Sequence, residues 1–151
     1  MHANSWRVTR GLAVSAVIAI ASFAAGTQAS AQCIDPPQRG NWVNVNPNTG
    51  SITRATIEFT CVDVIVAGVP PPPSWHVTLF GRCHPFDCPW GRVPGTSGAG
   101  GSINASYDQG FATRAVRITR VGTRLNIRIA TNFRDPGRRD YVSNDLMRRA
   151  P

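Results

Sequence analysis

The chain of 151 residues carries 16 basic and 8 acidic residues, all of the basic ones are arginine, and its net charge is +8. Without lysine the chain cannot form a P-loop, a Schiff base or a lysine general base, and with Glu58 as its only glutamate a catalytic carboxylate pair would need two aspartates. The net charge favours anionic partners.

The N-terminal segment, residues 1–31, has the pattern of a cleavable export signal. Arg7 and Arg10 precede an apolar run over residues 11–25, and Ala29-Ser30-Ala31 matches the A-x-A cleavage pattern. The run is shorter than the roughly 20 residues that a membrane-spanning helix needs. We therefore expect a signal helix that is removed on export to the periplasm or the medium. Residues 32–151 would remain as a single domain without a transmembrane segment.

Beyond residue 31 the chain consists of short β-like segments separated by turns. Apolar and polar side chains alternate with a period of two in the segments 54–61, 75–80, 103–107, 116–119 and 124–134. Turn-forming sequences lie at 46–50, 121–123 and 135–137. Strands with one apolar face must curl or stack to bury that face. We predict an all-β domain, a small up-and-down (meander) β-barrel of about seven or eight strands, which leaves no sheet edge free. A two-sheet β-sandwich is the alternative.

Three other segments lack this alternation. Residues 69–74 include four consecutive prolines, which predicts an extended polyproline segment. Residues 95–102 are rich in glycine and serine, which predicts a mobile loop. The C-terminal segment 143–151 either closes the barrel as its last strand or forms a short helical turn.

The cysteines of the exported part are Cys33, Cys61, Cys83 and Cys88. An even number of cysteines in an exported chain predicts two disulfides. Four cysteines allow three connectivities. We favour Cys83–Cys88 together with Cys33–Cys61, because the thiols of Cys83 and Cys88 are the closest along the chain.

The segment around the short cysteine pair offers the densest group of chemically active side chains. A disulfide there would display His84, Phe86, Asp87 and Trp90 on a rigid hairpin, as candidate ligand contacts. The alternatives are a stapled turn with local hydrogen bonds only, or a zinc or copper site built from Cys83, His84, Asp87 and Cys88. Disulfide formation competes with the metal site, because it removes both thiolates.

Three motifs resemble those of a group of small exported bacterial domains of unassigned function. Residues 40–49 (GNWVNVNPNT), followed by Ile52-Thr53-Arg54, match the opening G-x-W-x-N-x-x-P-x-T, and residues 83–91 (CHPFDCPWG) match the centre C-H-P-x-D-C-x-W-G. Residues 133–141 (FRDPGRRDY) match the ending F-x-D-x-x-G-R-x-D-Y loosely, with one residue fewer before the glycine. This resemblance implies a fold and a compartment but no activity.

The opening motif is also similar to the first strand of lipocalin- and avidin-type barrels, which begins with G-x-W. In those barrels an arginine near the last strand packs over the tryptophan. The likeness implies that Trp42 is structural, with Arg138 or Arg148 stacked on it by a cation–π contact.

Arginines are frequent in the last third of the chain. A basic stripe on the barrel exterior is predicted from Arg117, Arg124, Arg128 and Arg134, and its alternative is an ordinary solvated face. Arg117 and Arg128 are the candidate contacts for an acidic partner, such as an anionic glycan or an envelope component. We expect Asp135, Asp140 and Asp145 to pair with the terminal arginines. Few aromatic residues interleave with the stripe, which argues against specific nucleic-acid binding.

Together these features favour a monomeric, non-catalytic, exported binding or envelope-associated module, with no cofactor and no catalytic residue. Its unknown ligand would bind through the barrel mouth and the Cys83–Cys88 hairpin. One alternative is a metal-binding protein or metal-dependent enzyme that uses Cys83, His84, Asp87 and Cys88. A second alternative is a basic surface protein that binds acidic polymers.

Overall fold

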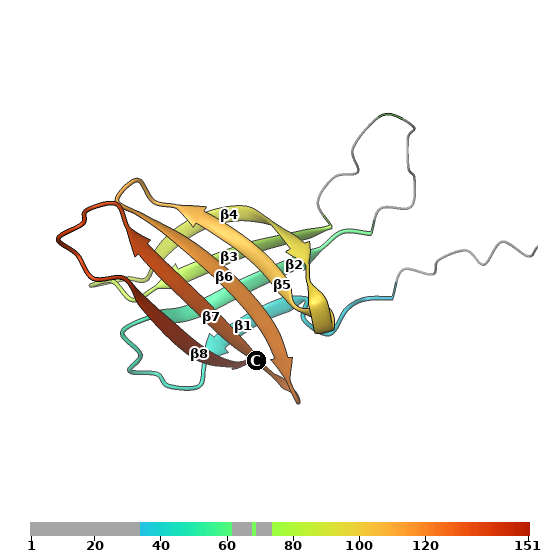
Figure 1. The fold of residues 1–151 in the computed structure, drawn as a ribbon. Helices are drawn as coiled ribbons and strands as arrows, with labels where there is room; N and C mark the ends of the chain where they lie inside the picture. The colour runs from blue at the N-terminus through green and yellow to red at the C-terminus, as the bar shows by residue number, and fades with distance from the viewer. Residues whose placement is uncertain (1–33, 62–67, 69–73) are drawn as a thin grey trace, which may run out of the picture. The chain divides into compact units, whose positions relative to one another are not determined.

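A computed structural model describes residues 34–61, 68 and 74–151 of the chain. These residues form a closed barrel in which each strand pairs antiparallel with the next and the last pairs with the first (Figure 1). The strands are β1 (Gly40–Asn44), β2 (Ile52–Phe59), β3 (Trp75–Gly81), β4 (Cys88–Ser97), β5 (Ile103–Asp108), β6 (Ala112–Val121), β7 (Arg124–Phe133) and β8 (Tyr141–Arg149), with a short 3-10 helix η1 (Ala99–Gly101) before β5. The predicted meander barrel is confirmed, and the β-sandwich alternative is wrong.

Some predictions fall on parts of the chain that the structure does not describe. The signal segment 1–31, Cys33 and the prolines of the 69–74 segment all lie outside the described residues. In the part of the chain that is described, no helix is long and apolar enough to cross a membrane.

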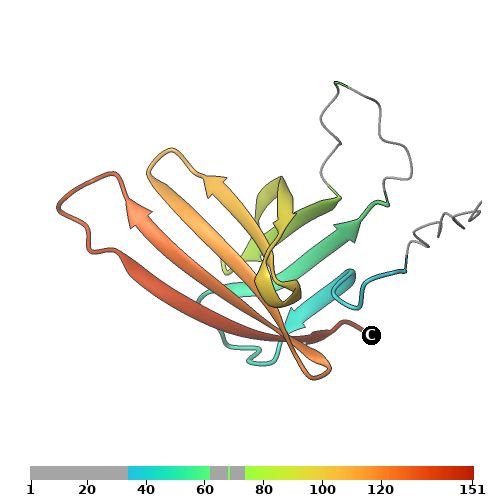
Figure 2. The same cartoon turned by 45° about the vertical axis from the view of Figure 1, so that its right-hand side comes forward.

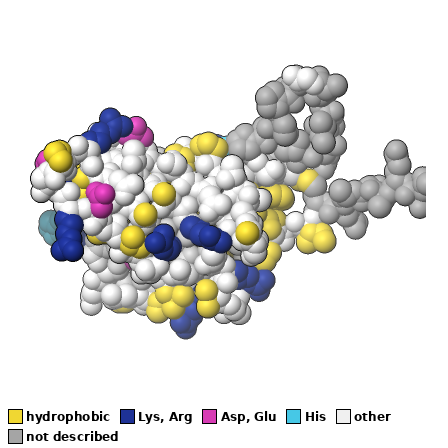
Figure 3. All heavy atoms as spheres, in the orientation of Figure 1, with side chains coloured by type: hydrophobic (Ala, Val, Ile, Leu, Met, Phe, Trp, Pro, Cys, Tyr) yellow, Lys and Arg dark blue, Asp and Glu magenta, His cyan; other side chains and the backbone are white. Residues whose placement is uncertain are grey.

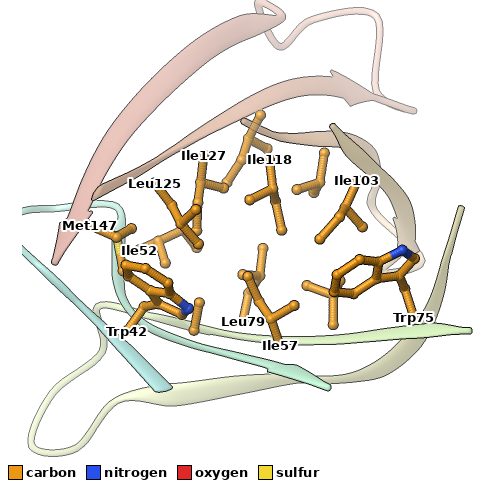
Figure 4. Packing of buried hydrophobic residues seen from close by; sticks show 14 of the residues in the cluster. Trp42, Ile52, Ile57, Trp75, Leu79, Ile103, Ile118, Leu125, Ile127 and Met147 are labelled. Carbon is orange, nitrogen blue, oxygen red and sulfur yellow. The ribbon is translucent and has the colours of Figure 1, made fainter. Parts of the chain in front are cut away.

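The barrel interior is filled by apolar side chains from alternate positions on its strands. Figure 4 shows Trp42 and Trp75 on opposite sides of this cluster, with aliphatic side chains between them. The inward residues that are at most 1 % exposed include Ile52, Ile57, Val77, Leu79, Ile103, Ile118, Leu125, Ile127, Ile129 and Met147. An eight-stranded barrel is just wide enough for side chains to fill its interior, so this part of the barrel is a packed core.

One end of the barrel is sealed around Trp42. The indole Nε1 donates a hydrogen bond to the Gln38 carbonyl at 3.0 Å, and the Arg149 guanidinium carbon lies 4.6 Å from the ring centroid. Arg149 also donates to the carbonyls of Arg39 and Pro37, at 2.9 and 2.8 Å. The residues before β1 are thereby tied to the end of β8.

An arginine stacks on Trp42, as predicted, but it is Arg149 and not Arg138 or Arg148. Arg149 stacks on the indole because β8 pairs with β1 so that Arg149 lies directly opposite Trp42. The neighbouring Arg148 is exposed, and Arg138 lies instead over the ring of Phe133, 3.9 Å from its centroid. Gly40 adopts a φ of +129°, and a Cβ there would come within 2.3 Å of Arg149 Nη1. The glycine of the G-x-W motif therefore makes room for this arginine.

The glycine-rich segment 95–102 is not the mobile loop that its composition predicts. Its first residues belong to β4, where Gly95 is buried and pairs with Trp75 and Ala105. A Cβ on Gly95 would lie 3.0 Å from side-chain atoms of Trp75 and Ile103, so the glycine allows close packing rather than mobility. For the C-terminal segment 143–151, the predicted alternatives were a last strand and a short helical turn. The segment belongs to β8, which closes the barrel, so the strand is confirmed.

Candidate functional site

The connections β1–β2, β3–β4, β5–β6 and β7–β8 lie together at the barrel end opposite the one that Arg149 seals. We call this end the mouth. Its loops are residues 45–51, 82–87, 109–111 and 134–140. The last two lie at the left of Figure 1 and remain side by side in the turned view of Figure 2. The hydrogen-bonded strands hold these loops on a rigid frame.

A pocket of about 670 Å³ opens in the mouth. Its lining includes Cys83, Cys88, Trp90, Phe111, Arg114 and Tyr141. Its volume falls in the range of about 300–1,000 Å³ that small-molecule sites occupy, and such sites combine aromatic walls with a few polar groups. We call it the mouth pocket.

The hairpin between β3 and β4 forms one side of the mouth pocket. Cys83 and Cys88 are joined by a disulfide, with their Cα atoms 5.5 Å apart, which confirms this pairing. None of the described cysteines is free, and Cys61 is also disulfide-bonded; its predicted partner Cys33 lies outside the described residues. The two bridged cysteines line the pocket, whereas His84 and Phe86 at the hairpin tip are exposed, Phe86 by 83 %, and are not among the lining residues.

Asp87 anchors this hairpin to β2. Its Oδ2 accepts a hydrogen bond from Arg54 Nε at 3.1 Å, and the Arg54 guanidinium lies over the Phe80 ring, 4.2 Å from its centroid. Desolvation raises the pKa of Asp87, but hydrogen bonds from Thr53 and Arg54 and the charges of Arg54 and Arg82 outweigh it and lower this pKa below its ordinary value. Asp87 therefore anchors the hairpin to β2, and it is not among the residues that line the mouth pocket.

The metal alternative does not fit this geometry. It requires two thiolates, and both sulfurs belong to the disulfide. Its carboxylate, Asp87, is engaged by Arg54. Within residues 34–61, 68 and 74–151, no group of three or more His, Cys, Asp and Glu side chains is arranged to hold a metal ion.

Trp90 lines the mouth pocket, and we call its indole ring the floor of the pocket. It packs edge-on against Tyr107, with ring centroids 5.6 Å apart at 79°. The Tyr107 hydroxyl donates to the Val77 carbonyl at 2.8 Å, and burial raises the pKa of this phenol well above its ordinary value. Gly81 leaves space for the indole, because a Cβ there would lie 2.7 Å from Trp90 Nε1. The indole is therefore held in place by its surroundings.

Arg114 lies on top of this floor and was missed as a site residue. Its guanidinium carbon is 4.2 Å from the Trp90 ring centroid. The Nε atom is buried and has no hydrogen-bond partner, and none of the ion pairs between described residues includes Arg114. Thr131, directly opposite Arg114 on β7, has a buried hydroxyl that is also without a partner. Arg114 lines the pocket and has unused hydrogen-bonding capacity, whereas Thr131 is not among the lining residues.

Asp145 is buried beneath the β1–β2 loop rather than paired with an arginine. Its carboxylate accepts hydrogen bonds from Asn44 Nδ2 at 2.9 Å, Thr49 Oγ1 at 3.3 Å and Ser51 Oγ at 2.7 Å. The predicted arginine pairing of the terminal aspartates was therefore wrong. Asp135 and Asp140 accept hydrogen bonds from the backbone nitrogens of Gly137 and Phe133.

A row of aromatic rings borders the mouth. The centroids of Phe111 and Phe133 are 6.4 Å apart, and those of Phe133 and Tyr141 are 6.0 Å apart. Phe111 is 50 % exposed and Tyr141 is 47 % exposed. Such partly exposed rings offer apolar contacts to a ligand that enters from solvent.

The predicted basic stripe is only partly continuous. Arg117 and Arg128 lie directly opposite each other on β6 and β7, and both are exposed. Arg124 lies at the distant end of β7, and Arg134 is engaged with Asp108 at 2.6 Å. Figure 3 shows basic side chains on this face as separate patches, with the acidic ones near the mouth end. Within the predicted stripe, Arg117 and Arg128 are the exposed arginines that lie directly opposite each other, and we call them the outer pair.

The signal for Arg114 was present in the sequence. Ala112, Arg114, Val116 and Ile118 share one face of β6, so the arginine occupies an inward position among apolar ones. Comparisons of the chain with protein-family models, with curated proteins and with solved structures found no match. The resemblance to exported domains and to lipocalin-type barrels therefore stays a prediction.

Proposed function

We propose that this domain is a non-catalytic, exported binding module that holds a small organic ligand in the mouth pocket, beside the Cys83–Cys88 hairpin. The observation that carries this proposal is the pocket of about 670 Å³ with aromatic walls at one end of the barrel. The opposite end is sealed by Trp42 and Arg149. A ligand would therefore enter and leave through the mouth.

The polar groups of the mouth favour binding over catalysis. Asp108, which lines the pocket, forms an ion pair with Arg134, and the Asp145 carboxylate is occupied by neutral donors. A general base needs a free lone pair within hydrogen-bond reach of its substrate. These carboxylates are engaged in holding the loops, which is what a pre-formed binding site requires.

Two features support export. The first 31 residues have the pattern of a cleavable signal. The Cys83–Cys88 disulfide belongs to the class of bonds that persist in oxidising compartments.

The outer pair Arg117 and Arg128 supports a second candidate function, the retention of acidic polymers. Like charges directly opposite each other on neighbouring strands repel, and an anionic chain laid across them would relieve that repulsion. Salt-sensitive retention on heparin that is lost in Arg117→Ser/Arg128→Ser would support this candidate, and retention independent of salt would count against it.

Binding in the mouth pocket can be tested with a neutral aromatic probe, anilinonaphthalene, whose fluorescence rises in apolar surroundings. We expect saturable binding of one dye per molecule of the disulfide-bonded protein. Ser143→Trp should abolish it, because Ser143 lines the pocket and the larger ring would fill it.

The matched control is Ser106→Trp, since Ser106 is exposed on β5. This variant should bind the dye as the original protein does, and thermal unfolding would verify that both variants fold. Dye binding that is absent, or that is equal in Ser143→Trp and Ser106→Trp, would contradict the proposal.

A further inference from the structure

We infer that the mouth pocket selects organic anions, namely molecules with an apolar or aromatic body and one carboxylate, phosphate or sulfonate group that binds at Arg114. This inference rests on the proposed function and specifies the chemical class of its ligand. The class follows from the cation of Arg114 and the aromatic rings that line the pocket with it.

Arg114 is a charge without a counterion. The arginines in ion pairs within the described ranges are Arg39, Arg54, Arg92 and Arg134, each with a neighbouring carboxylate. Arg114 instead has a buried Nε without a partner. A buried N–H without a hydrogen-bond acceptor is unfavourable, and an anionic ligand that accepts from it would remove this penalty. The free protein therefore has a reason to bind an anion at this place.

The guanidinium is also positioned before any ligand arrives. Trp90 lies under it at 4.2 Å, and Tyr107 supports the indole from the side. A guanidinium stacked on an aromatic face keeps the edges of its fork free, and that fork matches the oxygens of a carboxylate or phosphate. Because the guanidinium is already fixed, less side-chain conformational entropy is lost when an anion binds.

The aromatic part of the pocket lining favours an apolar body in the ligand. Phe111, Trp90 and Tyr141 contribute rings to its lining, and Pro89 adds a further apolar surface. A bare inorganic anion would leave these surfaces in contact with water. An organic anion would cover them while its charged group meets Arg114.

Two dyes with the same ring system separate the charge from the apolar body. Anilinonaphthalene is neutral, and anilinonaphthalene sulfonate adds one anionic group. Since a hydrogen bond to a charged group contributes about a tenfold factor or more in affinity, we expect the sulfonate to bind the disulfide-bonded protein at least about tenfold tighter than the neutral dye. In Arg114→Gln the two dissociation constants should become equal within about twofold.

Arg117→Gln is the matched control, because Arg117 lies on the outer face of the same strand and is exposed. It should keep the full preference for the sulfonate. If Arg114→Gln does not fold, the preference of the original protein for the sulfonate carries the test, and the absence of that preference overturns the inference.

The outcomes are distinct. If Arg114→Gln keeps the sulfonate preference, or if Arg117→Gln loses it, the inference is overturned while mouth binding of the neutral dye stands. If neither dye binds saturably to the original protein, the proposed function itself fails.

Discussion

Trp42→Ala should lower the free energy of unfolding by about 3–5 kcal/mol, the usual cost of truncating a large buried aromatic side chain. Trp42 is 3 % exposed and belongs to the central cluster. Its removal also deletes the hydrogen bond to Gln38 and the surface on which Arg149 stacks. The seal at this end of the barrel would therefore open.

Urea denaturation of the disulfide-bonded protein measures this cost. Phe86→Ala is the control, because Phe86 is a large aromatic residue that is 83 % exposed, and its truncation should change stability by less than about 0.5 kcal/mol. If Trp42→Ala lowers the free energy of unfolding by less than about 1 kcal/mol, the contacts of Trp42 do not provide the stability of this end of the barrel.

Asp145→Ala should cost about 2–3 kcal/mol, because hydrogen bonds to a charged group are strong and their loss is only partly offset by the removal of a buried charge. The side chains of Asn44, Thr49 and Ser51 would lose their common acceptor. Since these donors lie at or within the 45–51 connection, that side of the mouth should loosen.

Denaturation together with amide hydrogen exchange tests this prediction. Faster exchange should be confined to the β1–β2 connection. Asp135→Ala removes an exposed aspartate of the β7–β8 turn and should cost less than about 1 kcal/mol. Equal costs for Asp145→Ala and Asp135→Ala would mean that the buried carboxylate does not organise the mouth.

The strands that alternation could predict are those with regular inward and outward positions. Strands β2, β3, β5, β6 and β7 show this pattern locally. Strand β4 does not, because prolines and glycines interrupt it and its pairing with β3 shifts register between Thr78 and Phe80. Strand β8 carries a polar residue, Asp145, at an inward position. Segments β4 and β8 form strands because they pair with the neighbouring strands. This pairing cannot be read from the sequence of one segment alone.

The candidate site shows the same division between local and long-range information. The Cys83–Cys88 hairpin and Trp90 were predicted because they lie close together in the sequence. The match of Arg149 rather than Arg138 to Trp42 depends on the register between β1 and β8, which are more than a hundred residues apart. Arg114 could have been recognised by its position in the alternation of β6, and Asp145 only by the loop that folds over it.

The most direct test of the anion pocket is to follow the Nε–H resonance of Arg114 by NMR while anilinonaphthalene sulfonate is added to the folded, disulfide-bonded protein. We expect this resonance to shift saturably, with the dissociation constant that dye fluorescence gives, while the Nε–H resonances of Arg117 and Arg128 stay in place. An unmoved Arg114 resonance in the presence of bound dye, with shifts at the outer pair instead, would place the anion on the wall of the barrel and contradict binding in its mouth.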